Sequence, residues 1–99
     1  MIAFPPCRAP APPIPDPPVS PGPEVFIGGK AQAPRFVFGR NVTPSSNAGM
    51  PGLVIPAGMS KSWLPIGLEF DAPEGKDRRL LALGLSIQRV LGDIPAPSV

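Results

Sequence analysis

The sequence predicts an α/β fold with a proline-rich extended start, two paired strands and one helix. Three observations lead to this prediction. Prolines cluster before Glu24, two short apolar runs bounded by turn residues lie near 53–56 and 64–70, and an apolar helical periodicity lies near 76–91. The chain has 99 residues, 18 of them proline. Because prolines restrict the start, roughly 70 residues remain for regular structure, which is marginal for an independent core.

Residues 1–24 form the first predicted unit, an extended proline-rich segment. Each proline fixes φ and removes a backbone donor, which excludes a helix or a central strand here. A short strand is expected at Ile2–Phe4, ahead of the first proline, and a strand so close to the start suggests that further sequence belongs before it. Pro12 and Pro15, like Pro15 and Pro18, have the PxxP spacing that SH3-type domains bind, although proline runs produce this spacing by chance.

Residues 25–99 form the second predicted unit. Val25 to Ile27, a Gly-Gly turn and Arg35 to Phe38 are typical of a β-excursion, since paired glycines allow a tight turn. The stretch from Gly39 to Gly52 is rich in Asn, Ser, Pro and Gly, which predicts a loop with at most one helical turn.

A pair of strands is expected next. Leu53-Val54-Ile55 is a continuous apolar run bounded by Gly52 and Pro56, the pattern of a strand covered on both faces. Leu64 to Phe70 alternates, with its larger apolar residues on one face. Roughly seven residues join the two strands, too few for a helical crossover, so antiparallel pairing follows.

The predicted helix spans Lys76 to Leu91 and ends before Gly92 and Pro95. Its apolar residues occupy more than one stripe, so a helix of this kind needs cover on more than one side. A strand buried on both faces has the same need, which indicates a layered body. The missing cover must come from residues outside this chain, from another chain or from self-association.

Composition excludes several classes of function. The formal net charge is +2, from scattered charges rather than a basic patch, so no nucleic-acid partner is expected. No apolar run is long enough to cross a membrane, and no membrane partner is expected. The chain has no histidine and no phosphate-loop or dinucleotide motif, so neither a metal nor a cofactor is predicted. The single cysteine, Cys7, excludes an internal disulfide and favours a cytoplasmic location.

Few side chains are candidates for chemistry. Cys7 has no histidine to activate it and is interpreted as an inert thiol. Glu69 and Asp71 are close enough in sequence for a glycosidase-like pair, but the favoured interpretation is a solvated strand edge. Ser60 and Lys61 are interpreted as a polar hairpin loop.

An ordered set of motifs carries a family resemblance. The set comprises Arg40-Asn41-Val42-Thr43-Pro44-Ser45-Ser46-Asn47-Ala48-Gly49-Met50-Pro51-Gly52-Leu53, Val54-Ile55-Pro56-Ala57-Gly58, Leu64-Pro65-Ile66-Gly67-Leu68-Glu69 and Asp77-Arg78-Arg79-Leu80-Leu81. In this order they resemble the end of amidase-signature enzymes. Ser46-Asn47-Ala48-Gly49 and the Asp77 motif are most similar to the indoleacetamide and mandelamide hydrolase branch.

The resemblance implies the C-terminal, incomplete part of an amidase-signature mixed-sheet fold. Such enzymes hydrolyse a small carboxamide to acid and ammonia with a serine, a cis-serine and a lysine, none of which can be placed in this chain. The catalytic set is therefore empty and the isolated chain is expected to be inactive. The resemblance also implies Arg40, Asn41 and Thr43 as candidates for substrate binding. The competing interpretation is that Asn41 and Asn47 hydrogen-bond to loop backbone.

The same resemblance implies a partner, the missing N-terminal amidase portion. A non-catalytic interaction module, a complementing piece of a split amidase and self-association are the alternatives. Two positions depart from the family pattern. Trp63 replaces the glycine usual before Leu-Pro, and Lys76 stands where a capping Ser or Asp would stabilise the start of the helix.

Overall fold

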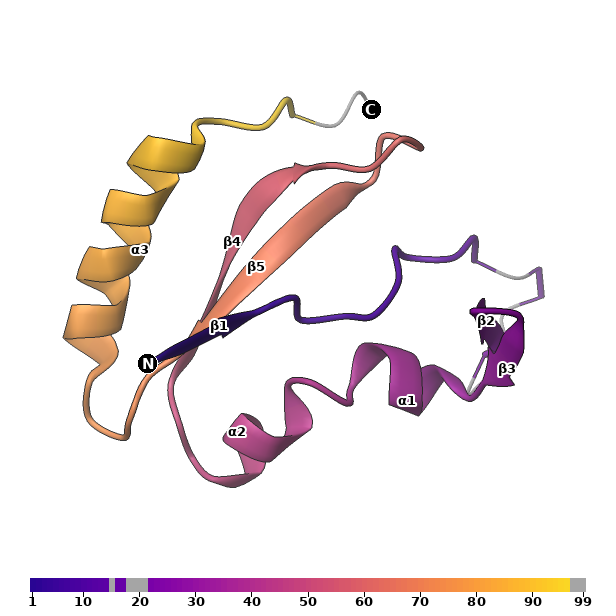
Figure 1. Cartoon of the computed structure of the whole chain (residues 1–99), viewed down its shortest axis with the longest axis horizontal. Helices are drawn as coiled ribbons and strands as arrows, with labels where there is room; N and C mark the ends of the chain where they lie inside the picture. Colours follow the sequence, from indigo (N-terminus) through magenta and orange to yellow (C-terminus); the bar gives the residue numbers. More distant parts are fainter. Residues whose placement is uncertain (15, 18–21, 97–99) are drawn as a thin grey trace.

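The computed structural model describes residues 1–14, 16–17 and 22–96, and its main feature is a three-stranded antiparallel sheet with one helix packed on it (Figure 1). Strands β1 (Ile2–Phe4), β5 (Pro65–Asp71) and β4 (Gly52–Met59) lie in that order, with β5 in the centre. Helix α3 (Asp77–Leu91) follows β5. The expected strand at the start of the chain and the α/β class are confirmed. The predicted SH3-type spacing involves Pro15 and Pro18, which lie outside the described residues.

The β4–β5 hairpin is antiparallel as expected, but β4 is longer than predicted. The strand continues through Pro56 to Met59, and the register shifts between Pro56 and Gly58. Proline is tolerated because β4 is an edge strand with a bulge, where a missing backbone donor leaves no ladder bond unmade. The connection therefore shortens to residues 60–64.

The hairpin loop is organised by Ser60. Its Oγ accepts hydrogen bonds from the backbone N–H groups of Ser62, at 3.2 Å, and Leu64, at 3.0 Å. The predicted polar hairpin loop is thus confirmed. Trp63 in this loop has a φ of 59° and a side chain that is 76% exposed. A left-handed backbone favours glycine, which explains physically why glycine is usual at this position in the resembling family.

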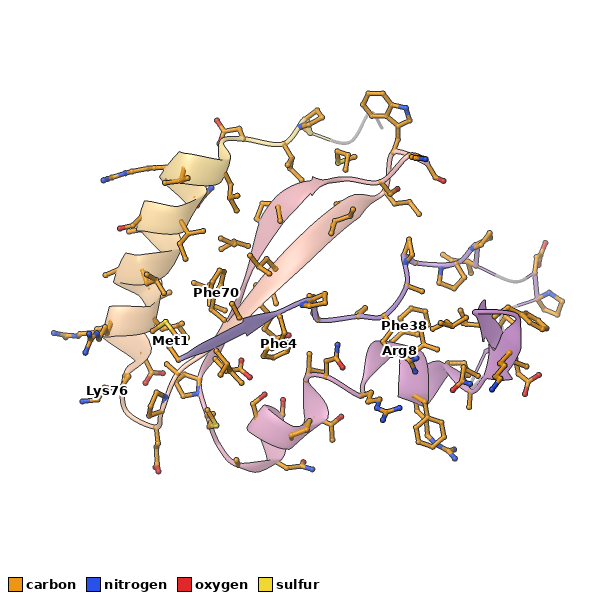
Figure 2. The ribbon with its side chains drawn as sticks, in the orientation of Figure 1. Met1, Phe4, Arg8, Phe38, Phe70 and Lys76 are labelled. Carbon is orange, nitrogen blue, oxygen red and sulfur yellow. The ribbon has the colours of Figure 1, made fainter. Side chains whose placement is uncertain are left out.

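The core lies between the sheet and α3. Ile55, Phe70, Ala72 and Leu80 are buried there, and Figure 2 shows Phe70 between the strands and the helix. Partly buried side chains pack around this cluster: Leu53, Leu68, Leu83 and Ile87. The close approach of helix and sheet depends on Gly84, because a Cβ at this position would collide with the Leu53 side chain.

Helix α3 has the predicted bounds. Lys76 is its N-cap and makes no side-chain capping bond, while the Gly92 N–H bonds to the Gln88 carbonyl at 2.9 Å. Its outward side chains are exposed, with Leu81 at 57% and Leu85 at 61%. None of the described helices is long and apolar enough to cross a membrane.

The expected two-sided cover is absent from the described residues. One face of the sheet holds α3, whereas on the other face Val54 of β4 is 52% exposed. Both the helix and the sheet therefore keep one apolar surface open. This is the arrangement expected of one layer from a thicker α/β body.

The predicted β-excursion is only half right. Strands β2 (Val25–Ile27) and β3 (Lys30–Gln32) pair across Gly28 and Gly29, both with positive φ. Arg35 to Phe38, expected as a strand, is instead helix α1 (Pro34–Phe38). A proline at the first helical position presets φ for a helical turn, and Lys30–Gln32 already supplies the partner that β2 needs. Helix α2 (Thr43–Asn47) confirms the single turn expected in the following loop.

Candidate functional site

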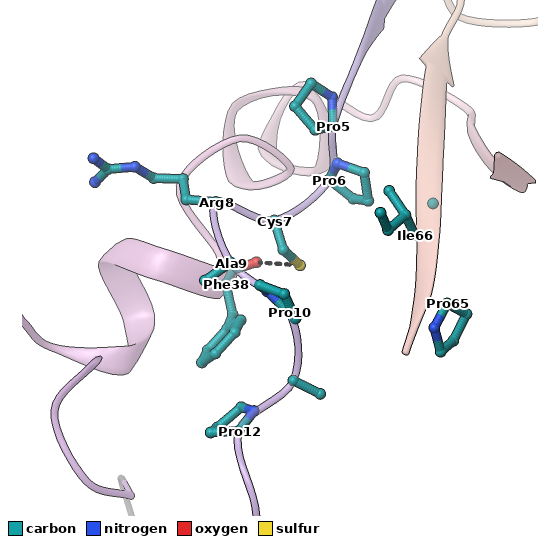
Figure 3. Close-up of a pocket in the computed structure, with 12 residues that line it drawn as sticks. Pro5, Pro6, Cys7, Arg8, Ala9, Pro10, Pro12, Phe38, Pro65 and Ile66 are labelled. Atoms are coloured by element: carbon teal, nitrogen blue, oxygen red, sulfur yellow. Dashed lines mark hydrogen bonds between the residues drawn. The ribbon is translucent and has the colours of Figure 1, made fainter. Parts of the chain in front are cut away.

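An open apolar pocket of about 560 Å³ lies between the proline-rich segment, the end of α1 and the start of β5 (Figure 3). Its walls are mostly proline, alanine and other apolar side chains. They are formed by Pro5, Pro6, Cys7, Arg8, Ala9, Pro10, Ala11, Pro12, Phe38, Pro65, Ile66 and Gly67. Proline rings make rigid walls, since their φ is fixed.

The polar groups of this pocket are few. The Cys7 thiol is half-buried and donates to the Phe38 carbonyl at a sulfur–oxygen distance of 3.7 Å. Arg8 is exposed, and its guanidinium group points away from the other labelled residues in Figure 3. The chain contains no histidine that could deprotonate the thiol. The pocket can therefore accommodate an apolar group but presents no activated nucleophile.

Arg40, Asn41 and Thr43 lie in the connection from α1 to α2, apart from the pocket walls. Arg40 is exposed. The Asn41 Nδ2 donates to the Pro5 carbonyl at 2.8 Å, and the Thr43 Oγ1 donates to the Gly39 carbonyl. Asn41 thus bonds to backbone, but to the N-terminal segment 36 residues away rather than within its own loop. The role of these three residues in substrate binding stays a prediction.

Glu69 and Asp71 are the strongest polar feature of the fold, and their interpretation as a solvated strand edge is wrong. Both side chains lie on the central strand β5, where Glu69 is 7% exposed and Asp71 is 1% exposed. Residues two apart on a strand point to the same face, so the two carboxyl groups share one side of the sheet. The intervening Phe70 points to the opposite side, into the core with α3.

The two carboxyl groups meet over Gly52. A Cβ on Gly52 would lie 2.9 Å from Asp71 Oδ1 and 3.2 Å from Glu69 Oε1. Glu69 Oε2 and both carboxylate oxygens of Asp71 are buried without a hydrogen-bond partner among the described residues. Burial raises the pKa of the Glu69 carboxyl, and the nearby negative charge of Asp71 raises that pKa further.

One signal in the sequence points to this burial and was missed. Ile2–Phe4 pairs with β5 through the register Ile2 to Asp71 and Phe4 to Glu69, which makes β5 a central strand. A strand flanked on both sides shields its side chains far better than an edge strand does. In the described part of the chain, no group of three or more His, Cys, Asp or Glu side chains is placed to hold a metal ion.

Comparison with known proteins finds amidases. An indoleacetamide hydrolase of Agrobacterium vitis is 44% identical over 63 residues, which is 64% of this chain and 14% of the relative. A mandelamide hydrolase of Pseudomonas putida is 47% identical over 60 residues, 60% of this chain and 12% of the relative. One subunit of a glutamyl-tRNA(Gln) amidotransferase from Chlorobium phaeobacteroides (strain BS1) is 38% identical over 74 residues, 73% and 16% respectively.

The chain therefore spans only 12–16% of the length of these curated relatives. No family model matches the chain. No solved structure matches it either.

Proposed function

Because the chain is related to the amidase-signature family, we propose that it is the C-terminal structural portion of an amidase that hydrolyses an arylalkyl carboxamide, such as indoleacetamide, to acid and ammonia. The observation that carries the proposal is the identity of 44–47% with an indoleacetamide hydrolase and a mandelamide hydrolase over about 60% of the chain. The order of the sequence motifs supports its placement at the end of such an enzyme.

The contribution of this chain is scaffold rather than catalysis. The Ser45 hydroxyl is buried and donates to the Val42 carbonyl, and Ser60 is engaged in the hairpin turn. Neither has the adjacent base that turns a serine into a nucleophile. Hydrolysis then depends on a serine and lysine located elsewhere in the enzyme, and the isolated chain is inactive.

The partner is the remaining body of the same amidase, bound against the outer face of α3. Leu81, Leu85 and Val90 on this face are 57%, 61% and 86% exposed, an apolar surface of the kind that marks an interface. The choice of partner follows from length, since the similar relatives are several times longer than this chain. In the assembled enzyme Arg40, Asn41 and Thr43 face the substrate. We place the assembly in the cytoplasm, where the lone Cys7 stays reduced.

The test is an assay of the purified chain with indoleacetamide and mandelamide, alone and after co-expression with an indoleacetamide hydrolase lacking the aligned segment. We expect no turnover by the chain alone, and ammonia release together with co-purification in the co-expressed sample. Leu85→Lys should weaken co-purification, whereas the matched Gln88→Lys on the exposed side of α3 should not. Turnover by the chain alone would refute the scaffold role.

An interaction module of separate function is the second candidate, favoured by the same exposed helix face. Under that alternative the chain self-associates or binds without restoring hydrolysis. A stable homodimer that leaves the truncated hydrolase inactive would support this alternative and would contradict the proposed amidase partner.

A further inference from the structure

The amidase proposal leaves the Glu69 and Asp71 pair without a role. Their side chains emerge on the side of β5 opposite α3, and both are more than nine-tenths shielded from solvent. Three of their four oxygens have no hydrogen-bond partner among the described residues. A buried ionised carboxylate without a partner is costly, and two of them side by side are costlier still.

The flanking strands offer no compensating charge. Ile2 and Phe4 of β1 flank the pair on one side, and Gly52 and Val54 of β4 flank it on the other. No residue of β1, β4 or α2 has a charged side chain, and the amino group of Met1 is exposed beside Ile2.

The remaining charged groups lie elsewhere. The charged residues of α3 belong to the opposite face of the sheet, and others in the neighbouring connections are exposed. These groups are Asp77, Arg78, Arg79 and Arg89 of α3, with Arg40, Glu74 and Lys76 in the connections. No cation among the described residues is therefore placed to hold both carboxyl groups ionised.

One proton relieves this conflict. A protonated carboxyl has an O–H that can donate to the neighbouring carboxylate, so one proton removes a charge and partners an oxygen of each group. Close carboxyl pairs with no cation behave in this way, and their titration belongs to the pair.

We propose that Glu69 and Asp71 bind one proton between them, and that losing it opens the sheet at its β1 edge. Strand β1 has three residues, and two of them, Ile2 and Phe4, pair directly beside the carboxyl groups. Its departure would give water access to both carboxylates at the smallest loss of structure. Strand β4, by contrast, is tied to the core through Ile55.

The sign of the pH dependence follows. The pKa of Glu69 is raised in the folded chain by burial first and by Asp71 second. The stability linked to Glu69 is therefore fully present below the pKa of the unfolded chain, and is lost as pH rises through the higher folded pKa. Closing of β1 is favoured by acid and opposed by base. This inference does not depend on the amidase proposal.

The first test is carboxyl ¹³C NMR of the full chain labelled at glutamate. The sequence has three glutamates, Glu24, Glu69 and Glu74, and Glu69→Gln identifies the Glu69 signal by removing it. We expect this signal to titrate at clearly higher pH than the other two. Asp71→Asn, which removes the neighbouring charge, should return the Glu69 titration toward that of Glu24 and Glu74.

Glu69 titrating together with the other two glutamates would overturn the proposal. So would a chain that is unfolded throughout the pH range, because the proposal requires a closed sheet in acid.

The second test is amide hydrogen exchange in β1. The exchange rate of the wild type relative to Glu69→Gln, compared at equal pH, should rise several-fold between about pH 5 and about pH 8. The side-chain amide introduced by Glu69→Gln can still donate to Asp71 but cannot titrate, which makes this variant the reference for an intact edge. Glu74→Gln removes an exposed carboxyl and should behave as the wild type. A constant ratio across this range would show that the proton does not control β1.

Discussion

Residues 52–91 and the residues before them are held in different ways. The later segment has strands of eight and seven residues, a helix of fifteen and a shared core at Ile55, Phe70 and Leu80. The earlier segment has elements of three to five residues, with Val37 as its buried apolar side chain among the described residues. Its position depends on isolated contacts, such as the Arg8 N–H donating to the Val37 carbonyl at 3.1 Å and Asn41 donating to Pro5.

This difference indicates an order of stability within the molecule. Regions with few buried apolar contacts open at lower free energy than regions that share a core. The hairpin and α3 should therefore behave as the stable unit, and the proline-rich segment with α1 and α2 as an attachment to it. Substitutions can break this comparison at three levels.

The largest effect is expected at Leu80, which is 2% exposed at the centre of the core. Leu80→Ala should lower the free energy of unfolding by about 2–5 kcal/mol, because it removes buried methyl groups and leaves a cavity. Urea unfolding followed by circular dichroism of α3 measures this loss. Val37→Ala, at a fully buried site in the earlier segment, should leave the α3 transition nearly unchanged. Equal losses for the two variants would contradict the division into a stable unit and an attachment.

A smaller effect is expected at Asn41. Asn41→Ala removes the hydrogen bond to Pro5 and should cost about 0.5–1.5 kcal/mol of local stability. Faster proteolysis of the N-terminal segment, with an unchanged α3 transition, is the expected result. Asn47→Ala is the matched control, because no side-chain hydrogen bond of Asn47 occurs within the described part of the chain. If both variants were cleaved at the wild-type rate, the contact with Pro5 would not fix the segment.

The smallest effect is a gain at the hairpin loop. Trp63 has a φ of 59°, and an L-residue in this region costs roughly 1–2 kcal/mol, part of which glycine returns through its greater freedom when unfolded. Trp63→Gly should therefore stabilise the hairpin by about 0.5–1 kcal/mol, seen as a higher urea midpoint. Trp63→Ala removes the exposed ring but keeps the strain, so it should give no gain. Stabilisation by alanine alone would place the cost in the side chain instead.

Sequence reasoning succeeds where a pattern is long and local. The apolar period of α3, its end at Gly92 and the alternation of β5 could all be predicted, because each depends on neighbours in sequence. It fails where a distant or single residue decides. Pro34 turns Arg35 to Phe38 into a helix, and an edge position allows Pro56 within β4.

The buried carboxyl pair is the clearest failure of local reasoning. Local sequence places Glu69 and Asp71 in solvent because their own strand ends nearby, yet Ile2–Phe4 shields them from the far end of the chain. For Arg40, Asn41 and Thr43, the structure gives positions and hydrogen bonds, whereas the resemblance alone suggests substrate contact. Their role depends on surfaces that the rest of an amidase would supply.

The most direct measurement of the central claim is the activity of a chimeric enzyme. In it, the aligned segment of the Agrobacterium vitis indoleacetamide hydrolase, 44% identical over 63 residues, is replaced by the corresponding residues of this chain. We predict a folded enzyme that hydrolyses indoleacetamide, and loss of both folding and activity when Leu80→Asp is added. A well-folded chimera without hydrolysis would contradict the account of this chain as the structural end of an amidase.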